Sequence, residues 1–136
     1  MFFSGKNKSK NTSLQQPSDP TITLGAAAEA RAEHFLHQQG LLTRAKNYRT
    51  KQGEIDLIMM QDDNIIFVEV RLRSHRQFAN AAESVTIAKQ KKLINAAQHY
   101  LQQYQLTEKV NCRFDVIAFS DNHSHPEWIK NAFSAH

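Results

Sequence analysis

The sequence predicts a small α/β domain with a mixed sheet, and three observations support this. Its 136 residues, 40% of them hydrophobic and 22% charged, suit one globular domain with a core of its own. Apolar residues recur at helical spacing in two segments, 24–39 and 86–105. Segments 54–73 and 113–119 are rich in β-branched and aromatic residues, as strands are. Helical and strand segments that alternate in this way are typical of α/β folds.

The first helix is expected over residues 24–39, with Thr23 as its N-cap and Gly40 as its C-terminal stop. Its apolar positions are Leu24, Ala28, Ala32, Phe35 and Leu36. Residues 43–51 are short and basic, and we expect a strand or an extended segment there.

A β-hairpin is expected next, from two apolar segments that flank the polar turn 61–64. The end of its second strand alternates, so two sets of side chains should point to opposite faces. These sets are Val68, Val70 and Leu72 on one face, and Glu69, Arg71 and Arg73 on the other.

The second helix is expected over residues 86–105, with Thr86 as its N-cap. Its predicted buried stripe consists of Ile94, Ala97, Leu101 and Tyr104. A strand over 113–119 follows, then a polar loop over 120–126 and a short terminal element that packs on the core through Trp128, Ile129 and Phe133.

Residues 1–23 are expected to form a disordered polar tail, because they offer almost nothing to bury against the entropy of ordering a chain. The tail holds three lysines and one aspartate, so it carries about half of the net charge of +4. Residues 24–136 are then a single, nearly neutral domain, and overall basicity is a weak indication of a nucleic-acid partner.

The composition excludes several classes of protein. The single cysteine, Cys112, rules out an internal disulfide and a zinc site built from cysteines. No apolar segment approaches the ~20 residues of a membrane helix, and the first residues do not form a secretory signal. We therefore expect a cytoplasmic protein without a membrane partner.

A pair of carboxylates is the sharpest functional prediction. If the hairpin turn centres on Asp62 and Asp63, then Asp56 lies directly opposite Glu69 on one face. Two like charges so placed oppose folding unless a cation or a proton lies between them. Mg²⁺ is typically held by one or two carboxylates together with phosphate oxygens and water. The alternative is that Asp56 pairs with an arginine, Arg71 or Arg73, on a solvated sheet face, and spacing alone leaves both interpretations open.

The motifs resemble those of a known bacterial family. Gly53-Glu54-Ile55-Asp56-Leu57-Ile58 and Phe67-Val68-Glu69-Val70-Arg71-x-Arg73, with Gly25-x-x-x-Glu29-x-x-Ala32, Asn47-x-Arg49 and Arg113-Phe114-Asp115-Val116, look like the YraN family, also called UPF0102. That family is assigned to the restriction-endonuclease-like PD-(D/E)xK superfamily, which is similar to archaeal Holliday-junction resolvases. The resemblance implies an αβββαβ core with a mixed central sheet flanked by helices, and a nuclease site that uses Mg²⁺ or Mn²⁺.

In that pattern the catalytic residues are Glu29, Asp56, Glu69 and Arg71, and the metal ligands are Asp56 and Glu69. Arg71 occupies the position of the family's lysine, and an arginine cannot act as a base near neutral pH. Lys51 and Lys89 are the other amines that could reach the site. Two alternatives therefore stay open: an endonuclease on structured or branched DNA, and a catalytically impaired nucleic-acid-binding module. A protein-interaction domain is a third interpretation.

Basic residues near the carboxylates in sequence are the candidates for holding a phosphodiester backbone, although solvated surface charges explain them equally well. They are Arg49, Lys51, Arg73, Arg76, Lys89 and Lys92. His99 is expected to face solvent. The resemblance to resolvases, which act as pairs, also implies a homodimer as a further expectation.

Overall fold

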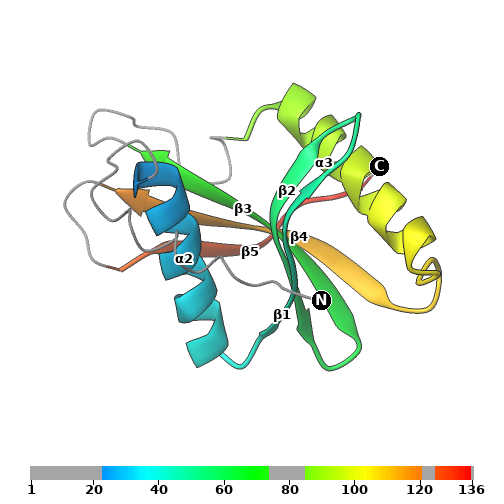
Figure 1. Cartoon of the computed structure of the whole chain (residues 1–136), viewed down its shortest axis with the longest axis horizontal. Coiled ribbons are helices and arrows are strands. Elements are labelled where there is room, and N and C mark those ends of the chain that lie inside the picture. The colour runs from blue at the N-terminus through cyan, green and yellow to red at the C-terminus, as the bar shows by residue number, and fades with distance from the viewer. Residues whose placement is uncertain (1–22, 74–84, 121–124, 136) are drawn as a thin grey trace, which may run out of the picture.

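The structure, a computed structural model, describes residues 23–73, 85–120 and 125–135. Within them the chain forms two helices and five strands (Figure 1). In chain order these are α2 (Thr23–Gln38), β1 (Leu42–Arg49), β2 (Glu54–Gln61), β3 (Asn64–Arg73), α3 (Ile87–Gln103), β4 (Asn111–Ser120) and β5 (Glu127–Phe133). The predicted α/β class is confirmed, and the terminal element is a strand. The predicted tail, apart from Thr23, and the predicted contact residue Arg76 lie outside the described residues.

The five strands form one mixed sheet in the order β1-β2-β3-β4-β5. Neighbouring strands are antiparallel except for β3 and β4, which run parallel. Parallel strands need a long crossover connection, and α3 lies in the connection between β3 and β4. This arrangement makes β3 the central strand, with β2 and β4 on its two sides.

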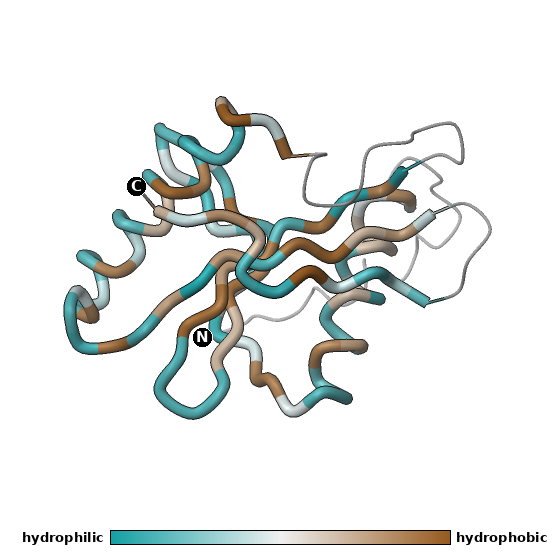
Figure 2. The backbone as a smooth tube through the Cα atoms, turned by 180° about the vertical axis from the view of Figure 1, so that it is seen from behind, coloured by the Kyte–Doolittle hydropathy of each residue, from teal (hydrophilic) through white to brown (hydrophobic). Residues whose placement is uncertain are grey.

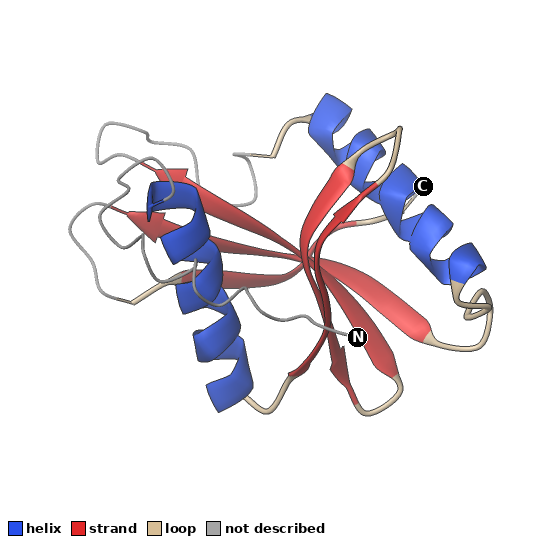
Figure 3. Ribbon diagram, viewed as in Figure 1, coloured by secondary structure: helices blue, strands red, loops and turns tan. Residues whose placement is uncertain are grey.

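The two helices pack on opposite faces of the sheet. Figure 2 shows hydrophobic residues concentrated along the strands, between hydrophilic turns. On one face Ala28, Ala32 and Leu36 of α2 pack against strand residues such as Val68. Figure 3 shows α2 and α3 separated by the twisted sheet. Neither of these helices, the only ones in the described residues, is long and apolar enough to cross a membrane.

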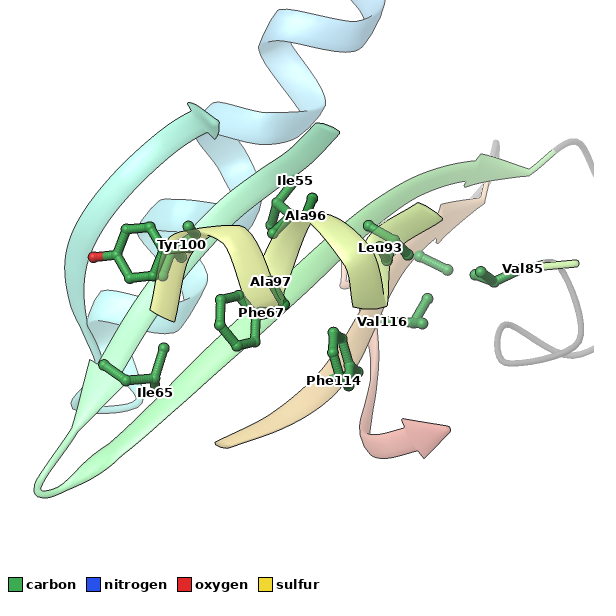
Figure 4. Packing of buried hydrophobic residues seen from close by; sticks show 12 residues of the cluster. Ile55, Ile65, Phe67, Val85, Leu93, Ala96, Ala97, Tyr100, Phe114 and Val116 are labelled. Carbon is green, nitrogen blue, oxygen red and sulfur yellow. The ribbon is translucent and has the colours of Figure 1, made fainter. Parts of the chain in front are cut away.

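The core beneath α3 differs from the predicted stripe. Figure 4 shows the helix lying over Phe67 and Phe114 of the sheet. Its buried residues are Leu93, Ala96, Ala97 and Tyr100. Of the predicted stripe only Ala97 is fully buried, and Tyr104 is 53% exposed because it caps the end of the helix. The small side chains of Ala96 and Ala97 allow the helix to approach the sheet closely, so they set the face that is buried.

The first helix also departs from its predicted pattern at one position. Leu24 is 75% exposed, since it lies in the first turn of α2, ahead of the buried residues. The predicted stop is confirmed: Gly40 adopts φ +93°, and Leu41 N donates to Leu36 O at 3.0 Å. A helix that ends on a glycine in the left-handed region is a common capping arrangement.

A buried aspartate fixes β5 to the edge of the sheet. Asp115 is 1% exposed and accepts hydrogen bonds from the Arg113 guanidinium, Trp128 Nε1 and Asn131 N at 2.9 to 3.1 Å. Both of its oxygens are therefore satisfied, as a buried charge requires. These contacts explain a structural role for Asp115 that spacing alone did not predict.

Candidate carboxylate site

The hairpin register that sets the carboxylate pair is confirmed. Leu57 pairs with Val68 and Gln61 with Asn64, the register expected for a turn at residues 62 and 63. Asp56 and Glu69 are the next residues along the two strands, beyond the last paired residues of the ladder. Phe67 and Glu69 both lie on the α3 side of β3, where Phe67 belongs to the core beneath that helix.

Regular backbone pairing is interrupted on both sides of Asp56. On the β3 side, Val70 N donates to Asp56 Oδ2 at 2.8 Å, so the side chain takes part in the strand pairing. On the β1 side, Lys46 pairs with Leu57 and Tyr48 with Ile55, while Asn47 between them adopts φ 52°. A residue in the left-handed region re-aims the chain locally, much as a β-bulge does.

This irregularity brings the first helix into the site. Asn47 Nδ2 donates to Glu29 Oε1 of α2 at 3.2 Å. Burial and the charge of Asp56 raise the pKa of Glu29. The structure therefore brings Glu29, Asp56 and Glu69 into one neighbourhood from three different elements.

The electrostatics of the pair are unfavourable when both groups are ionised. Burial, and then the neighbouring charge of Glu69, raise the pKa of Asp56 to about 7. Burial also raises the pKa of Glu69, which is 4% exposed, although the nearby cations oppose this. The pair therefore holds a proton more tightly than ordinary carboxylates do, or takes a cation in its place.

Two cations border Glu69 from different elements. Lys89 Nζ of α3 lies 3.6 Å from Glu69 Oε2, and Arg71 Nη1 lies 3.5 Å from the same oxygen. Thr86, the predicted N-cap of α3, is confirmed: its hydroxyl accepts from Lys89 N at 3.2 Å. The cap thus holds the first turn of the helix, from which Lys89 reaches the carboxylate.

The donor set fits a hard divalent cation in part. Glu69 Oε1 is buried and accepts no hydrogen bond from an N–H or hydroxyl group of the described residues. Together with Asp56 it offers two adjacent carboxylates, which is enough for a Mg²⁺ or Mn²⁺ ion that keeps several waters. No group of three or more His, Cys, Asp or Glu residues in the described ranges is arranged to hold a metal ion. Glu29 therefore lies beside the pair rather than completing a three-carboxylate cage.

The two arginines that could pair with Asp56 in the alternative interpretation contact other carboxylates. Arg71 pairs with Glu69, and Arg73 Nη2 lies 2.9 Å from Glu127 Oε1 of β5. Asp56 uses one of its oxygens to accept from the backbone of β3, as described above.

The predicted basic residues are divided between several places. Arg49 Nε lies 3.3 Å from Glu54 Oε2, at the start of the turn that joins β1 and β2. Lys92 touches the same turn through its backbone, against Gly53. Of the predicted phosphate-contacting residues, Lys89 lies at the carboxylate pair itself, and Arg73 is drawn toward β5.

Sequence reasoning missed two contributors to this region. Glu54 acts on Glu29, whose pKa its charge helps to raise. His99 is exposed, as expected, but its Nδ1 lies 2.6 Å from Tyr48 Oη. Both contacts depend on tertiary packing, which sequence spacing alone does not show.

Comparisons with known proteins place the chain among close relatives. The model of "Uncharacterised protein family UPF0102" matches residues 28–119. A UPF0102 protein from Methylobacillus flagellatus is 50% identical over 113 residues, covering 82% of this chain and 97% of the relative. Another from Janthinobacterium is 50% identical over 111 residues, covering 82% and 87%. A third, from Aeromonas hydrophila, is 48% identical over 118 residues, covering 86% and 88%. The family resemblance drawn from the motifs is thereby confirmed, while the superfamily assignment stays a prediction.

Proposed function

Since this chain belongs to the uncharacterised protein family UPF0102, a family whose description names no activity, we propose its function from its own geometry: a divalent-metal-dependent endonuclease that hydrolyses phosphodiesters in structured or branched DNA. The single cysteine, exposed and without a disulfide, suits action in the cytoplasm. A homodimer would suit the two-fold symmetry of a branched junction.

The observation that carries the proposal is the carboxylate pair, with Glu69 buried and Asp56 half-buried, bordered by cations. Asp56 and Glu69 adjoin one another, with burial raising the pKa of both. If the pair had a structural role, we would expect its oxygens to be satisfied like those of Asp115, whose four hydrogen bonds occupy both oxygens. Perturbed pKa values and unsatisfied buried oxygens are typical of functional sites.

Each residue of the site has a role in this proposal. A divalent cation held by Asp56 and Glu69 would supply a Lewis acid that lowers the pKa of water and polarises a phosphoryl oxygen. Arg71 would hold the scissile phosphate through its planar fork of N–H donors. Glu29 would orient the attacking water by accepting its hydrogen bond.

Lys89 would supply the ammonium that the family pattern places on β3. It reaches Glu69 from α3 at 3.6 Å, so Arg71 need not act in its place. The presence of both cations supports an active enzyme over an impaired one.

The experiment is a cleavage assay on four-way-junction DNA with Mn²⁺, with the linear duplex as comparison. We expect cutting by the wild type, no cutting in EDTA, and no cutting by Asp56→Asn. Asp63→Asn, the same substitution in the exposed turn of the same hairpin, should cut normally. Undiminished cutting by Asp56→Asn would show that a contaminant or another site is responsible.

The second candidate is a nucleic-acid-binding module that does not cut, which Arg71 at the lysine position favours. It predicts binding of junction DNA that weakens steeply with salt and survives chelation of divalent ions. Binding without cutting, in wild type and in Arg71→Lys alike, would favour this candidate.

A further inference from the structure

A polar groove lies outside the carboxylate pair, between the β1–β2 turn and α3. Its larger part, ≈ 550 Å³, is lined by Arg49, Thr50, Lys51, Gln52 and His99. An adjoining hollow of ≈ 360 Å³ is lined by Gln52, Asn95, Gln98, His99 and Gln102. Because Gln52 and His99 line both, we treat the two as one feature and call it the α3 groove.

The turn side of the groove is held in place by its own hydrogen bonds. Thr50 Oγ1 accepts from Gln52 N at 3.1 Å and from Gly53 N at 3.0 Å. Thr50 N in turn donates to Gly53 O at 2.8 Å. Gly53 lies so close to α3 that a Cβ atom there would be 2.5 Å from Lys92 O. Figure 1 shows this turn beside α3.

The helix side of the groove presents a fixed imidazole. Tyr48 Oη lies 2.6 Å from His99 Nδ1. Burial raises the pKa of Tyr48, so its hydroxyl keeps its proton and can donate to Nδ1. In that arrangement Nε2 is the ring nitrogen that remains for a ligand.

The lining chemistry indicates an anionic ligand with exposed hydrogen-bonding edges. Among the residues that line the groove, all of them in the described part of the chain, there are two cations and one histidine but no aspartate or glutamate. The remaining polar groups are mostly side-chain amides, namely Gln52, Asn95, Gln98 and Gln102. Amides can bond the edges of unpaired bases, whereas cations alone would be enough for the backbone of a duplex.

The β1–β2 turn and α3 link the groove to the carboxylate site. Arg49 at its mouth pairs with Glu54, whose charge acts on Glu29. Along α3, Lys89 at Glu69 and His99 in the groove are ten residues apart, which is about 15 Å at 1.5 Å per residue. That distance corresponds to about four stacked nucleotides at 3.4 Å each.

We propose that the α3 groove binds a single-stranded segment of nucleic acid that continues from the phosphate at the carboxylate pair. Arg49 and Lys51 contact its phosphates, while His99 and the amides contact its bases. The inference rests on the proposed function, because the direction of the bound strand follows from the scissile phosphate lying at Asp56 and Glu69. It defines the substrate as DNA with an unpaired strand next to the cutting site.

The test is fluorescence anisotropy in EDTA, with the full chain and two labelled probes: a DNA duplex with an eight-nucleotide single-stranded extension, and the same duplex with blunt ends. We expect Lys51→Ala to weaken binding of the extended probe by about tenfold and to lower its salt slope by ~0.7. Binding of the blunt probe should change less than about twofold, the size of an ordinary peripheral charge effect. Lys130→Ala removes the same charge from β5, at the opposite edge of the sheet, and should leave both probes unaffected.

A second variant separates groove binding from charge alone. His99→Ala should weaken binding of only the extended probe, by about fivefold, as loss of one base contact does. If His99→Ala does not fold, Lys51→Ala, at an exposed residue of the turn, still tests the proposal. Equal losses on both probes, no loss on either, or the same loss in Lys130→Ala would each overturn the proposal. Because the assay needs no cutting, a selective loss in a chain that does not cleave DNA would support the groove and refute the nuclease. An unchanged affinity in a chain that does cleave would refute the groove alone.

Discussion

Replacing Asp56 with asparagine should stabilise this protein at neutral pH. The pKa of Asp56 is raised from 3.8 to about 7 in the folded state, and each pKa unit corresponds to ~1.4 kcal/mol. Ionisation of Asp56 therefore opposes folding by roughly 4–4.5 kcal/mol above pH 7. Asparagine removes that charge, while its Oδ1 can still accept the hydrogen bond from Val70 N.

The sign of the effect depends on pH. A carboxyl with a raised folded-state pKa contributes stability below its unfolded pKa, near 3.8, and loses that contribution as the pH rises through about 7. Asp56→Asn should therefore match the wild type near pH 4. At pH 8 in EDTA it should unfold about 10 °C higher, because a domain of this size gains several degrees per kcal/mol.

The assay is thermal unfolding by circular dichroism at pH 4, 6 and 8 in EDTA. Asp115→Asn is the matched control, since it removes a buried carboxylate that four donor contacts satisfy. That variant should lose about 3–5 kcal/mol, the usual effect of breaking a buried ion pair. If Asp56→Asn were destabilised to a similar extent at pH 8, the carboxylate pair would be structural and the reasoning would be refuted.

Three further predictions concern the turn, the edge strand and the site. Gly53→Ala should destabilise the fold by about 1–3 kcal/mol in urea unfolding because of its contact with Lys92 O, whereas Gly25→Ala, with open space around it, should be neutral or stabilising. Trp128→Phe removes a 2.9 Å hydrogen bond to Asp115 and should lower the free energy of unfolding by about 1.5–3 kcal/mol; no change would mean that this bond does not hold β5. Lys89→Ala should lower the rate of junction cleavage by at least ~10²-fold, whereas Lys91→Ala, on an exposed neighbour, should cleave normally, and equal rates would remove Lys89 from the mechanism.

The position of the carboxylate pair could be predicted from sequence because strand geometry is local. A short polar turn between two apolar segments fixes the hairpin register, and the register fixes which side chains are opposite one another. The same arithmetic did not predict that both ladders are interrupted at Asp56. The interruption on the β1 side depends on the left-handed conformation of Asn47, and nothing in a short polar segment indicates that conformation.

The surroundings of the pair depend on tertiary packing and were less accessible. Lys89 was one of several lysines in the first turns of α3, and only the way that the helix packs on the sheet selects it. The stripe predicted for α3 was displaced for the same reason: Ile94 and Leu101 are apolar, but Leu93 and Tyr100 face Phe67 and the sheet. Two overlapping apolar stripes on one helix cannot be distinguished by periodicity alone.

The central claim is that Asp56 and Glu69 together hold a divalent cation, and Mn²⁺ binding tests it most directly. Electron paramagnetic resonance of free Mn²⁺, titrated with protein at pH 8, should show about one bound ion per chain in the wild type and in Asp63→Asn, and none in Asp56→Asn. Binding should weaken as the pH falls below about 7, where Asp56 takes up its proton. Undiminished Mn²⁺ binding by Asp56→Asn, or no binding by the wild type, would contradict the claim.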